Sequence, residues 1–487
     1  MKSSDDASAN ASADAPANAP ADALIGALRA IVGDRGVVTD GAELAPYGTD
    51  WRQLFHGQAR CAVLPRRTEE VAAVVRLCAA AGVAIVAQGG NTGLSGGATP
   101  DASGQQLVLS LARMNAIRAL DPIGETLELE AGVVLQTAQE AALEAGLLLP
   151  ISLAAEGSAR IGGVISTNAG GTNVLRYGMA RARVLGLEVV TAQGDIVSGL
   201  RRLRKDNAGY DWKQWFIGSE GTLGIVTAAV LQLAPLPRHR VTALLAVPSA
   251  DAALQLLVAA RRAIGETLNA FELMSGAALE LVARHRQLKT PLAAAPWYVL
   301  IEASSALAGL RDAVEALLGD VLEREFASDG VVAESARQEA ELWALRESIT
   351  EAESRAGPSV KHDVSVPIAA IPDFLRAADA AVAHAFPLAR INAFGHAGDG
   401  NLHYNVVVPA HTDAARLNAL VHDLVVAHGG SISAEHGIGQ YRVGELERCR
   451  SASELALARR IKHALDPAGL LNPGKVLAPR RESESGP

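Results

Sequence analysis

Two glycine-rich turns constrain the fold of this 487-residue chain more than any other feature. One runs from Gly395 to His403 and the other from Ala434 to Gly439, and between them they hold three histidines and a glutamate. This concentration is unusual, because the whole chain has only 12 histidines. Side chains that bind metals or move protons, gathered in two short turns, are typical of a catalytic metal site.

The spacing of the first two histidines predicts a hairpin. His396 and His403 are seven residues apart, so on one straight strand their imidazoles would point to opposite faces. Strand-like residues 391–394 and 402–408 flank the turn sequence Gly398-Asp399-Gly400, which is typical of a reversal between antiparallel strands. A hairpin lets the two imidazoles converge, and Glu435 would then approach from the second turn.

Two histidines and one glutamate form a ligand set that leaves one position of a tetrahedral zinc open for water or substrate. Structural zinc sites are closed and usually rich in cysteine, whereas Cys61, Cys78 and Cys449 are scattered along the chain. In the alternative interpretation, the turns only reverse the chain and each histidine is a surface or core residue. For any single histidine we favour this alternative interpretation, but the clustering of all four side chains favours the metal site.

Length and charge limit the classes of protein to consider. A chain of this length is too long for one hydrophobic core, so two or three domains are expected, and a hydrophobic fraction of 49% suffices to fill them. The net charge of −9 argues against nucleic acid as the main partner. No apolar run is long enough to cross a membrane. Scattered cysteines are compatible with a reducing compartment, so we expect a cytoplasmic protein.

The first residues differ in composition from the rest. Residues 1–23 are rich in alanine, serine, aspartate, asparagine and proline. They lack the basic start and the apolar stretch of a secretion signal. We predict a disordered tail over this range.

The pattern along the chain predicts an α+β protein. Residues 60–98 read as strand, helix, strand and glycine loop, a βαβ-like opening whose helix runs from Thr68 to Gly82. Further strands are expected at 106–111, 126–131, 184–191 and 223–233, with a helix at 135–145 and a long glycine-rich loop at 149–181. Pro235-Leu236-Pro237 marks a domain boundary. Beyond it, strand-then-helix order occurs twice and fits a ferredoxin-like antiparallel sheet with helices on one face.

Several glycine clusters fit an extended cofactor. Residues 87–97 follow a predicted strand, and their bare glycines let backbone N–H groups approach a pyrophosphate. This loop matches neither the Gly-x-Gly-x-x-Gly fingerprint nor a Walker loop, and alone it could simply turn the chain. Further clusters at 156–158, 168–173 and 218–224 favour a cofactor that touches several loops.

The motifs in combination carry a resemblance to a known family. They are the Gly89–Leu94 loop, both histidine turns, and the stretches 167–171, 175–178, 206–211, 216–227 and 472–475. Together they resemble the FAD-linked D-2-hydroxyacid dehydrogenases of the vanillyl-alcohol-oxidase type, in particular the D-2-hydroxyglutarate dehydrogenase branch. The resemblance extends over residues 45–478.

The resemblance implies a domain order. Residues 24–237 would form a two-subdomain FAD-binding domain of the PCMH type, and residues 238–460 a ferredoxin-like domain for substrate and metal. Residues 461–487 would form a C-terminal helical segment that returns to the FAD domain.

The resemblance also implies how FAD is held. The expected contacts are Gly89, Gly90, Asn91, Thr92, Gly93, Leu94, Gly157, Ser158, Gly163, Thr167, Ala169, Gly170, Glu220, Gly221, Ile225 and Asn472. Relatives with a tethered flavin carry a histidine where this chain has Asn91. We therefore expect non-covalent FAD.

The implied reaction is oxidation of a D-2-hydroxy acid, foremost D-2-hydroxyglutarate to 2-oxoglutarate, with a hydride passing to flavin N5. Zn²⁺ or another divalent metal on His396, His403 and Glu435 would coordinate the substrate hydroxyl and lower its pKa. His436 would be the general base, with a fourth ligand or an orienter of Glu435 as alternatives.

The resemblance assigns substrate contacts to Arg346, Thr350 and Lys361, and a hydrogen bond near the metal to Asn401. Arg442 stands where many relatives carry a lysine. Electrons would pass to an electron-transfer flavoprotein, a quinone or a cytochrome rather than to oxygen. The substrate could instead be D-lactate or another D-2-hydroxy acid. A non-redox FAD-dependent transferase, an electron-relay flavin subunit and a homodimeric assembly also stay open.

Overall fold

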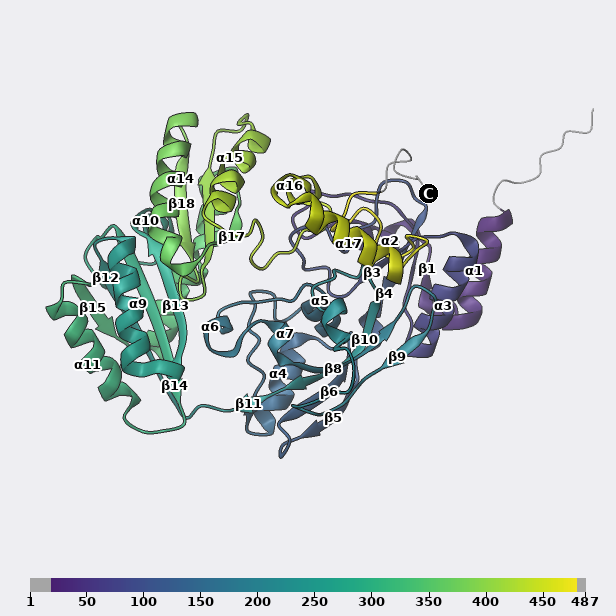
Figure 1. The fold of residues 1–487 in the computed structure, drawn as a ribbon, viewed down its shortest axis with the longest axis horizontal. Helices are drawn as coiled ribbons and strands as arrows, with labels where there is room; N and C mark the ends of the chain where they lie inside the picture. The colour runs from purple at the N-terminus through teal and green to yellow at the C-terminus, as the bar shows by residue number, and fades with distance from the viewer. Residues whose placement is uncertain (1–18, 480–487) are drawn as a thin grey trace, which may run out of the picture.

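The structure is a computed structural model that describes residues 19–479. It has two lobes, a first one built on two sheets and a second one built on a single larger sheet (Figure 1). Of the predicted tail, residues 1–18 lie outside the described residues, and helix α1 (Ala19–Val32) occupies the remainder. Within residues 19–479, no helix combines the length and apolar character needed to cross a bilayer.

The first sheet has the strand order β1-β2-β4-β3. Its strands are β1 (Val37–Val38), β2 (Ala59–Val63), β3 (Ile85–Gln88) and β4 (Gln106–Ser110), and α2 (Gly41–Gly48) and α3 (Thr68–Ala81) join them. The predicted strand-helix-strand order is correct. However, β2 and β3 are not neighbours, because β4 lies between them and pairs in parallel with both. All five residues of β4 are buried, as is typical of a central parallel strand.

The second sheet is antiparallel, with the order β5-β6-β10-β8-β9. Its strands are β5 (Ile117–Asp121), β6 (Thr126–Glu130), β8 (Val184–Val190), β9 (Ile196–Ser198) and β10 (Ile225–Gln232), and α4 (Leu135–Glu144) packs in the same core. A short ribbon of β7 (Leu147–Leu148) and β11 (Ala234–Pro235) lies beside them, and α8 (Lys213–Phe216) precedes β10.

The predicted loop at 149–181 is wrong in part, because it contains three short helices. They are α5 (Ile161–Ser166), α6 (Val174–Tyr177) and α7 (Ala180–Arg183). The glycines of α5 disfavour a helix in isolation. In the folded chain Gly162 packs closely against Ala131, and a Cβ at position 162 would collide with the Cβ of Ala131. Tight packing therefore requires a glycine here in spite of its low helix propensity.

The second lobe is one antiparallel sheet in the order β15-β12-β14-β13-β18-β19-β16, and β17 also pairs with β19. Its strands are β12 (His239–Val247), β13 (Leu268–Ser275), β14 (Trp297–Ser305), β15 (Asp329–Val332), β16 (Ser359–Val360), β17 (Asp363–Ser365), β18 (Arg390–Gly395) and β19 (Asn401–Val407).

Helices cover both faces of this sheet, whereas one covered face was predicted. On one face lie α9 (Ala250–Ile264), α11 (Leu310–Glu323), α14 (Ile371–Ala385) and α15 (Ala414–Ala427), and on the other α10 (Gly276–Arg286), α12 (Ala336–Glu347) and α13 (Ile349–Ala356). Leu245 of β12 packs in the first core and its neighbour Leu244 in the second. Strands buried on both sides are continuously apolar, which explains the long hydrophobic run of β12.

The end of the chain lies against the first lobe. Helices α16 (Val443–Cys449) and α17 (Ala452–Leu465) are yellow in Figure 1. Helix α16 contacts α15 through Glu445 and His422, whereas Lys462 of α17 donates to the carbonyl of Thr222 in the first lobe. Leu471 pairs with Ile85 at the edge of the first sheet, and Leu470 and Leu471 are buried in its core. Residues that follow the second lobe in sequence therefore help to complete the first.

Candidate active site

The predicted hairpin is confirmed. Strands β18 and β19 are antiparallel, with Phe394 opposite His403, and His396 lies in the turn between them. Gly400 of this turn has a φ of +93°, and a Cβ there would lie 2.5 Å from the carbonyl oxygen of Val366. Only glycine fits this position without strain.

The three predicted metal ligands lie together. His396, His403 and Glu435 can each offer one ligand atom so that all three atoms lie within 4.8 Å of one another. The Nε2 atom of His396 is 4.0 Å from Oε2 of Glu435. Tetrahedral zinc with ligand distances of about 2.0–2.1 Å separates its ligand atoms by about 3.3 Å. Small side-chain movements would therefore suffice, and this donor set fits a catalytic zinc.

Asp363, a residue to which sequence reasoning gave no role, holds the second turn. Its Oδ2 accepts hydrogen bonds from the backbone N–H groups of Glu435 and His436, both at 2.9 Å. Its Oδ1 accepts one from Nδ2 of Asn401 at 2.9 Å. Asp363, Glu435 and His436 also lie within metal-binding reach of one another. Because these three hydrogen bonds occupy both oxygens of Asp363, we interpret it as an orienting group rather than a ligand.

Asp363 also lies behind two imidazoles. Its carboxylate is 3.5 Å from Nδ1 of His436 and 3.8 Å from Nδ1 of His403. Burial would raise the pKa of Asp363, but the two histidines and the two N–H groups hold that pKa below its usual range. Burial lowers the pKa of His403 to about 3. His403 is therefore neutral near pH 7, which is the form that binds metal.

A second buried carboxylate, Glu272 of β13, was also missed. Its Oε1 lies 2.7 Å from Nδ1 of His396, and its Oε2 accepts a hydrogen bond from Nε of Arg346 at 2.8 Å. Burial would raise the pKa of Glu272, yet its two cationic neighbours lower it to about 2. Burial would lower the pKa of His396, but Glu272 raises it to about 9. The one signal in the sequence is a lone carboxylate in an otherwise uncharged strand.

The four residues predicted to contact substrate do not form one cluster. Arg346 is buried beside Glu272, and its guanidinium lies over the ring of Phe394, 4.8 Å from the centroid. Nζ of Lys361 lies 3.8 Å from Glu353, itself fully buried. Asn401 supports Asp363, and Thr350 is exposed at the start of α13. Their contacts with substrate stay predictions.

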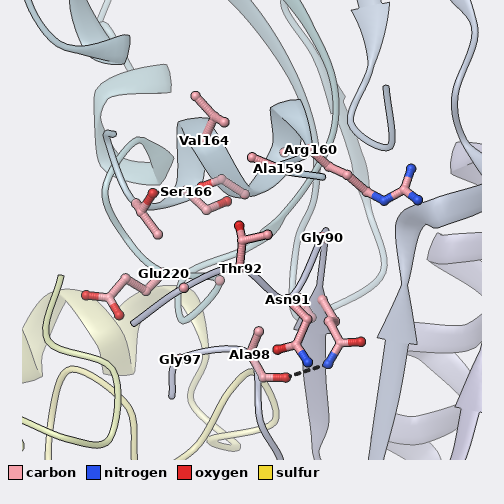
Figure 2. A pocket seen from close by; sticks show the side chains of 18 of the residues that line it. Gly90, Asn91, Thr92, Gly97, Ala98, Ala159, Arg160, Val164, Ser166 and Glu220 are labelled. Carbon is pink, nitrogen blue, oxygen red and sulfur yellow. Dashed lines mark hydrogen bonds between the residues drawn. The ribbon is translucent and has the colours of Figure 1, made fainter. Parts of the chain in front are cut away.

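A hollow lies in the first lobe (Figure 2). Asn91, Thr92, Ser166 and Glu220 surround it, and His436 also lines it. Of the predicted FAD contacts, those in its wall are Gly89, Gly90, Asn91, Thr92, Gly93, Gly163, Thr167, Ala169, Glu220, Gly221 and Ile225.

An adjoining hollow shares part of this wall. Gly157 and Ser158 line it, together with Gly89, Gly90 and Asn91 of the first hollow. Arg160, which sequence reasoning did not single out, lines both hollows. Two connected hollows suit an extended ligand such as a dinucleotide.

The backbone of the first hollow fits a close-lying cofactor. Gly93 and Gly163 both line it, and a Cβ built on either would meet nothing within 4 Å, so open space lies in front of the bare backbone. Gly90 is different, because a Cβ there would collide with the carbonyl of Ser158. Backbone without side chains in front of open space lets a pyrophosphate or a flavin edge approach closely.

Three predicted FAD contacts line neither hollow, namely Leu94, Gly170 and Asn472. Gly170 instead makes room for Glu435, whose Oε1 a Cβ at that position would approach to 2.6 Å. Nδ2 of Asn472 donates hydrogen bonds to the carbonyls of Gly97 and Glu220, two residues that line the hollow, so Asn472 stabilises its wall.

The Glu220 side chain has a role that sequence reasoning missed. Its two carboxylate oxygens accept hydrogen bonds from the N–H groups of Ile438 and Gly439, both at 2.7 Å. Arg442 is buried and donates to Oγ of Ser95 and to the carbonyl of Gly437. The turn that bears Glu435 and His436 is thus fixed to the wall of the hollow.

The arrangement defines a class of protein, an FAD-linked oxidoreductase with its metal-type cluster beside the flavin hollow. Comparisons with known proteins agree. Residues 59–199 match the family model described as FAD binding domain, and residues 236–476 match FAD linked oxidases, C-terminal domain. Two solved structures share the fold with a TM-score of 0.72 and 18% identity: alkyldihydroxyacetonephosphate synthase, over 93% of this chain and 84% of that one, and p-cresol methylhydroxylase, over 94% and 96%.

Curated relatives narrow the class. The chain is 43% identical to D-2-hydroxyglutarate dehydrogenase of Xanthomonas citri, over 90% of this chain and 93% of that protein. It is 40% identical to the mitochondrial D-2-hydroxyglutarate dehydrogenase of Bos taurus, over 93% and 83%. The chain belongs to the D-2-hydroxyglutarate dehydrogenase family of FAD-dependent D-2-hydroxyacid dehydrogenases. The predicted family and α+β fold class are confirmed, and the transferase and relay alternatives are set aside.

Proposed function

We propose that the protein oxidises D-2-hydroxyglutarate to 2-oxoglutarate with the help of a divalent metal, for which zinc is our candidate. One observation carries the proposal: His436 lines the flavin hollow, while its neighbour Glu435 belongs to the metal cluster. A substrate carbon held between them would face the flavin on one side and the metal on the other.

Bound FAD would supply the hydride acceptor, and a metal on His396, His403 and Glu435 would supply a Lewis acid for the substrate hydroxyl. His436 accepts the hydroxyl proton. Asp363 behind it holds the turn through two backbone hydrogen bonds and faces its ring at 3.5 Å, which favours the imidazolium that forms.

Two cations suit a dicarboxylate. Nε of Arg346 is bonded to Glu272, so its two terminal nitrogens can fork onto a carboxylate. Lys361 lies 29% exposed beside Glu353 and supplies a second positive charge. These groups support a substrate with a carboxylate at each end over D-lactate.

The fate of the electrons and the attachment of FAD are also proposals. Nδ2 of Asn91 donates to the carbonyl of Thr49, and an amide side chain offers no nucleophile for a flavin tether. This supports non-covalent FAD. We further propose that the protein passes electrons to an electron-transfer flavoprotein, a quinone or a cytochrome.

A substrate panel tests the proposal. The zinc-loaded protein is assayed with an artificial electron acceptor against D-2-hydroxyglutarate, L-2-hydroxyglutarate, D-malate and D-lactate. We expect the highest kcat/KM for D-2-hydroxyglutarate and none for the L form. A higher kcat/KM for D-lactate than for both dicarboxylates would contradict the substrate.

The base is tested by His436→Gln. Loss of a general base typically lowers kcat about 10²- to 10⁴-fold, and we expect this loss with FAD still bound. His428→Gln is the control, because the ring of His428 contacts the carbonyl of Leu424 and the ring of Phe374 and no predicted ligand. Full activity in His436→Gln would remove His436 as the base.

A further inference from the structure

Glu272 lies where two parts of the site meet. It sits in the middle of β13, its side chain is 1% exposed, and the other residues of the strand carry no charge. Its two oxygens contact side chains from two other elements, His396 just after β18 and Arg346 on α12. One buried carboxylate therefore touches a metal ligand and a cation assigned to the substrate.

The contact with His396 fixes which nitrogen can bind a metal. An ionised carboxylate can only accept a hydrogen bond, so Nδ1 of His396, 2.7 Å away, carries the proton. Nε2 is then the nitrogen at which a metal can displace the second proton of this imidazolium, and it faces Oε2 of Glu435 at 4.0 Å. Carboxylates that hold a metal-binding histidine in this way set its tautomer and strengthen its binding.

The contact with Arg346 fixes the direction of the guanidinium. Its Nε donates to Oε2 of Glu272 at 2.8 Å, and its plane lies over Phe394. No hydrogen bond of its two terminal nitrogens occurs within the described part of the chain. They form the fork that matches a carboxylate.

We propose that Glu272 is a positioning residue that locks the metal site and the substrate-binding cation into one unit. The inference rests on the proposed function and deepens it. Because one rigid carboxylate sets both groups, it also sets the separation between the metal-bound end of the acid and its distal carboxylate. Glu272 would thereby favour a dicarboxylate over D-lactate.

The variant Glu272→Gln tests whether Glu272 orients both groups or only balances the positive charge of the buried Arg346. Glutamine has nearly the same shape, but it offers one acceptor oxygen and one donor NH₂ group. If its NH₂ group faces His396, the proton moves to Nε2 and blocks the metal. If it faces Arg346, two donors meet. Either way one of the two linked groups loses its orientation.

Glu302 provides a matched control. It is a buried glutamate of the neighbouring strand β14, and it binds Asn269 and Trp343 rather than any predicted ligand. Glu302→Gln thus removes the same charge from the same sheet without changing a contact of a predicted metal ligand. It is the control for zinc binding alone, because Asn269 also bonds to Arg176 of the first lobe.

The experiment measures zinc affinity by competition with a chromogenic chelator, on FAD-loaded protein, beside kcat and KM for D-2-hydroxyglutarate and D-lactate. We expect Glu272→Gln to weaken zinc binding about 10- to 100-fold, to raise KM for D-2-hydroxyglutarate and to reduce its preference over D-lactate. Glu302→Gln should bind zinc as the wild type does. Unchanged zinc affinity together with an unchanged KM for D-2-hydroxyglutarate in folded Glu272→Gln would overturn the inference.

The outcomes keep the two proposals apart. If the wild type binds zinc tightly and Glu272→Gln matches it in both zinc affinity and KM, only the role of Glu272 is wrong. If the wild type binds no divalent metal, the proposed metal site and this inference are both wrong. If Glu272→Gln does not accumulate as yellow protein, Glu272→Asp takes its place. The shorter carboxylate cannot reach both partners, so zinc affinity falls or KM rises, and no change in either overturns the inference.

Discussion

Asp363 is the residue on which the second turn depends. Asp363 is buried and accepts hydrogen bonds from the backbone N–H groups of Glu435 and His436. Its carboxylate also faces the rings of His403 and His436. No local pattern marks it, because its partners lie 40 and more than 70 residues further along the chain. The ligands could be predicted from their clustering, whereas the groups that orient them could not.

We predict that Asp363→Asn lowers kcat about 10- to 100-fold, the range for loss of an orienting partner. The amide has one acceptor oxygen for several donors, so the free energy of unfolding should fall by about 1–3 kcal/mol. Steady-state assays and urea titration measure the two effects. Asp379→Asn is the control, since Asp379 accepts a hydrogen bond from the hydroxyl of Tyr404 and from no predicted ligand. Equal kcat in wild type and Asp363→Asn would argue against the orienting role.

At the scale of elements, the hairpin of β18 and β19 was predictable and the surroundings of its sheet were not. The turn glycines and the flanking apolar residues are local signals, so the hairpin emerged from a few neighbouring residues. The second layer of helices, α10, α12 and α13, depends on which face each helix meets. That is decided by tertiary packing, which periodicity alone does not report.

The hairpin turn gives a prediction on glycine geometry. Gly400→Ala would place a Cβ against the carbonyl of Val366 at a φ of +93°, so it should destabilise the fold by about 1–3 kcal/mol and weaken zinc binding. In contrast, Gly319 lies inside helix α11 with open space around it, and Gly319→Ala should stabilise by about 0.5–1 kcal/mol. Thermal unfolding with and without zinc measures both. A Gly400→Ala protein as stable as Gly319→Ala would show that the turn tolerates a side chain.

At the scale of the whole molecule, the site is assembled across the two lobes. Arg176 of α6 reaches from the first lobe to Asn269 and Ser304 of the second. Gly171 of the first lobe donates its N–H to Glu435, and Glu220 holds the turn that follows. These links join residues that lie far apart in the sequence, so no local pattern could predict them.

Arg176→Ala should loosen this junction. We expect FAD content to stay unchanged and kcat/KM to fall at least about tenfold, which corresponds to about 1.4 kcal/mol. Absorbance at the flavin band and steady-state kinetics measure the two quantities. Arg201→Ala is the control, because Arg201 is exposed and pairs only with Asp206. A kcat/KM equal to that of Arg201→Ala would mean that Arg176 plays no part in joining the lobes.

The central claim is that a metal on His396, His403 and Glu435 presents the substrate to the flavin. Its most direct test is anaerobic reduction of the bound FAD by D-2-hydroxyglutarate in a stopped-flow instrument, with metal-stripped protein and with the same protein after zinc is restored. We expect rapid bleaching of the yellow colour with zinc and bleaching at least about 100-fold slower without it. Loss of the metal would remove several kcal/mol of stabilisation from the charge that develops in the transition state, which corresponds to a change of this size. Equal bleaching rates in the two preparations would contradict the central claim.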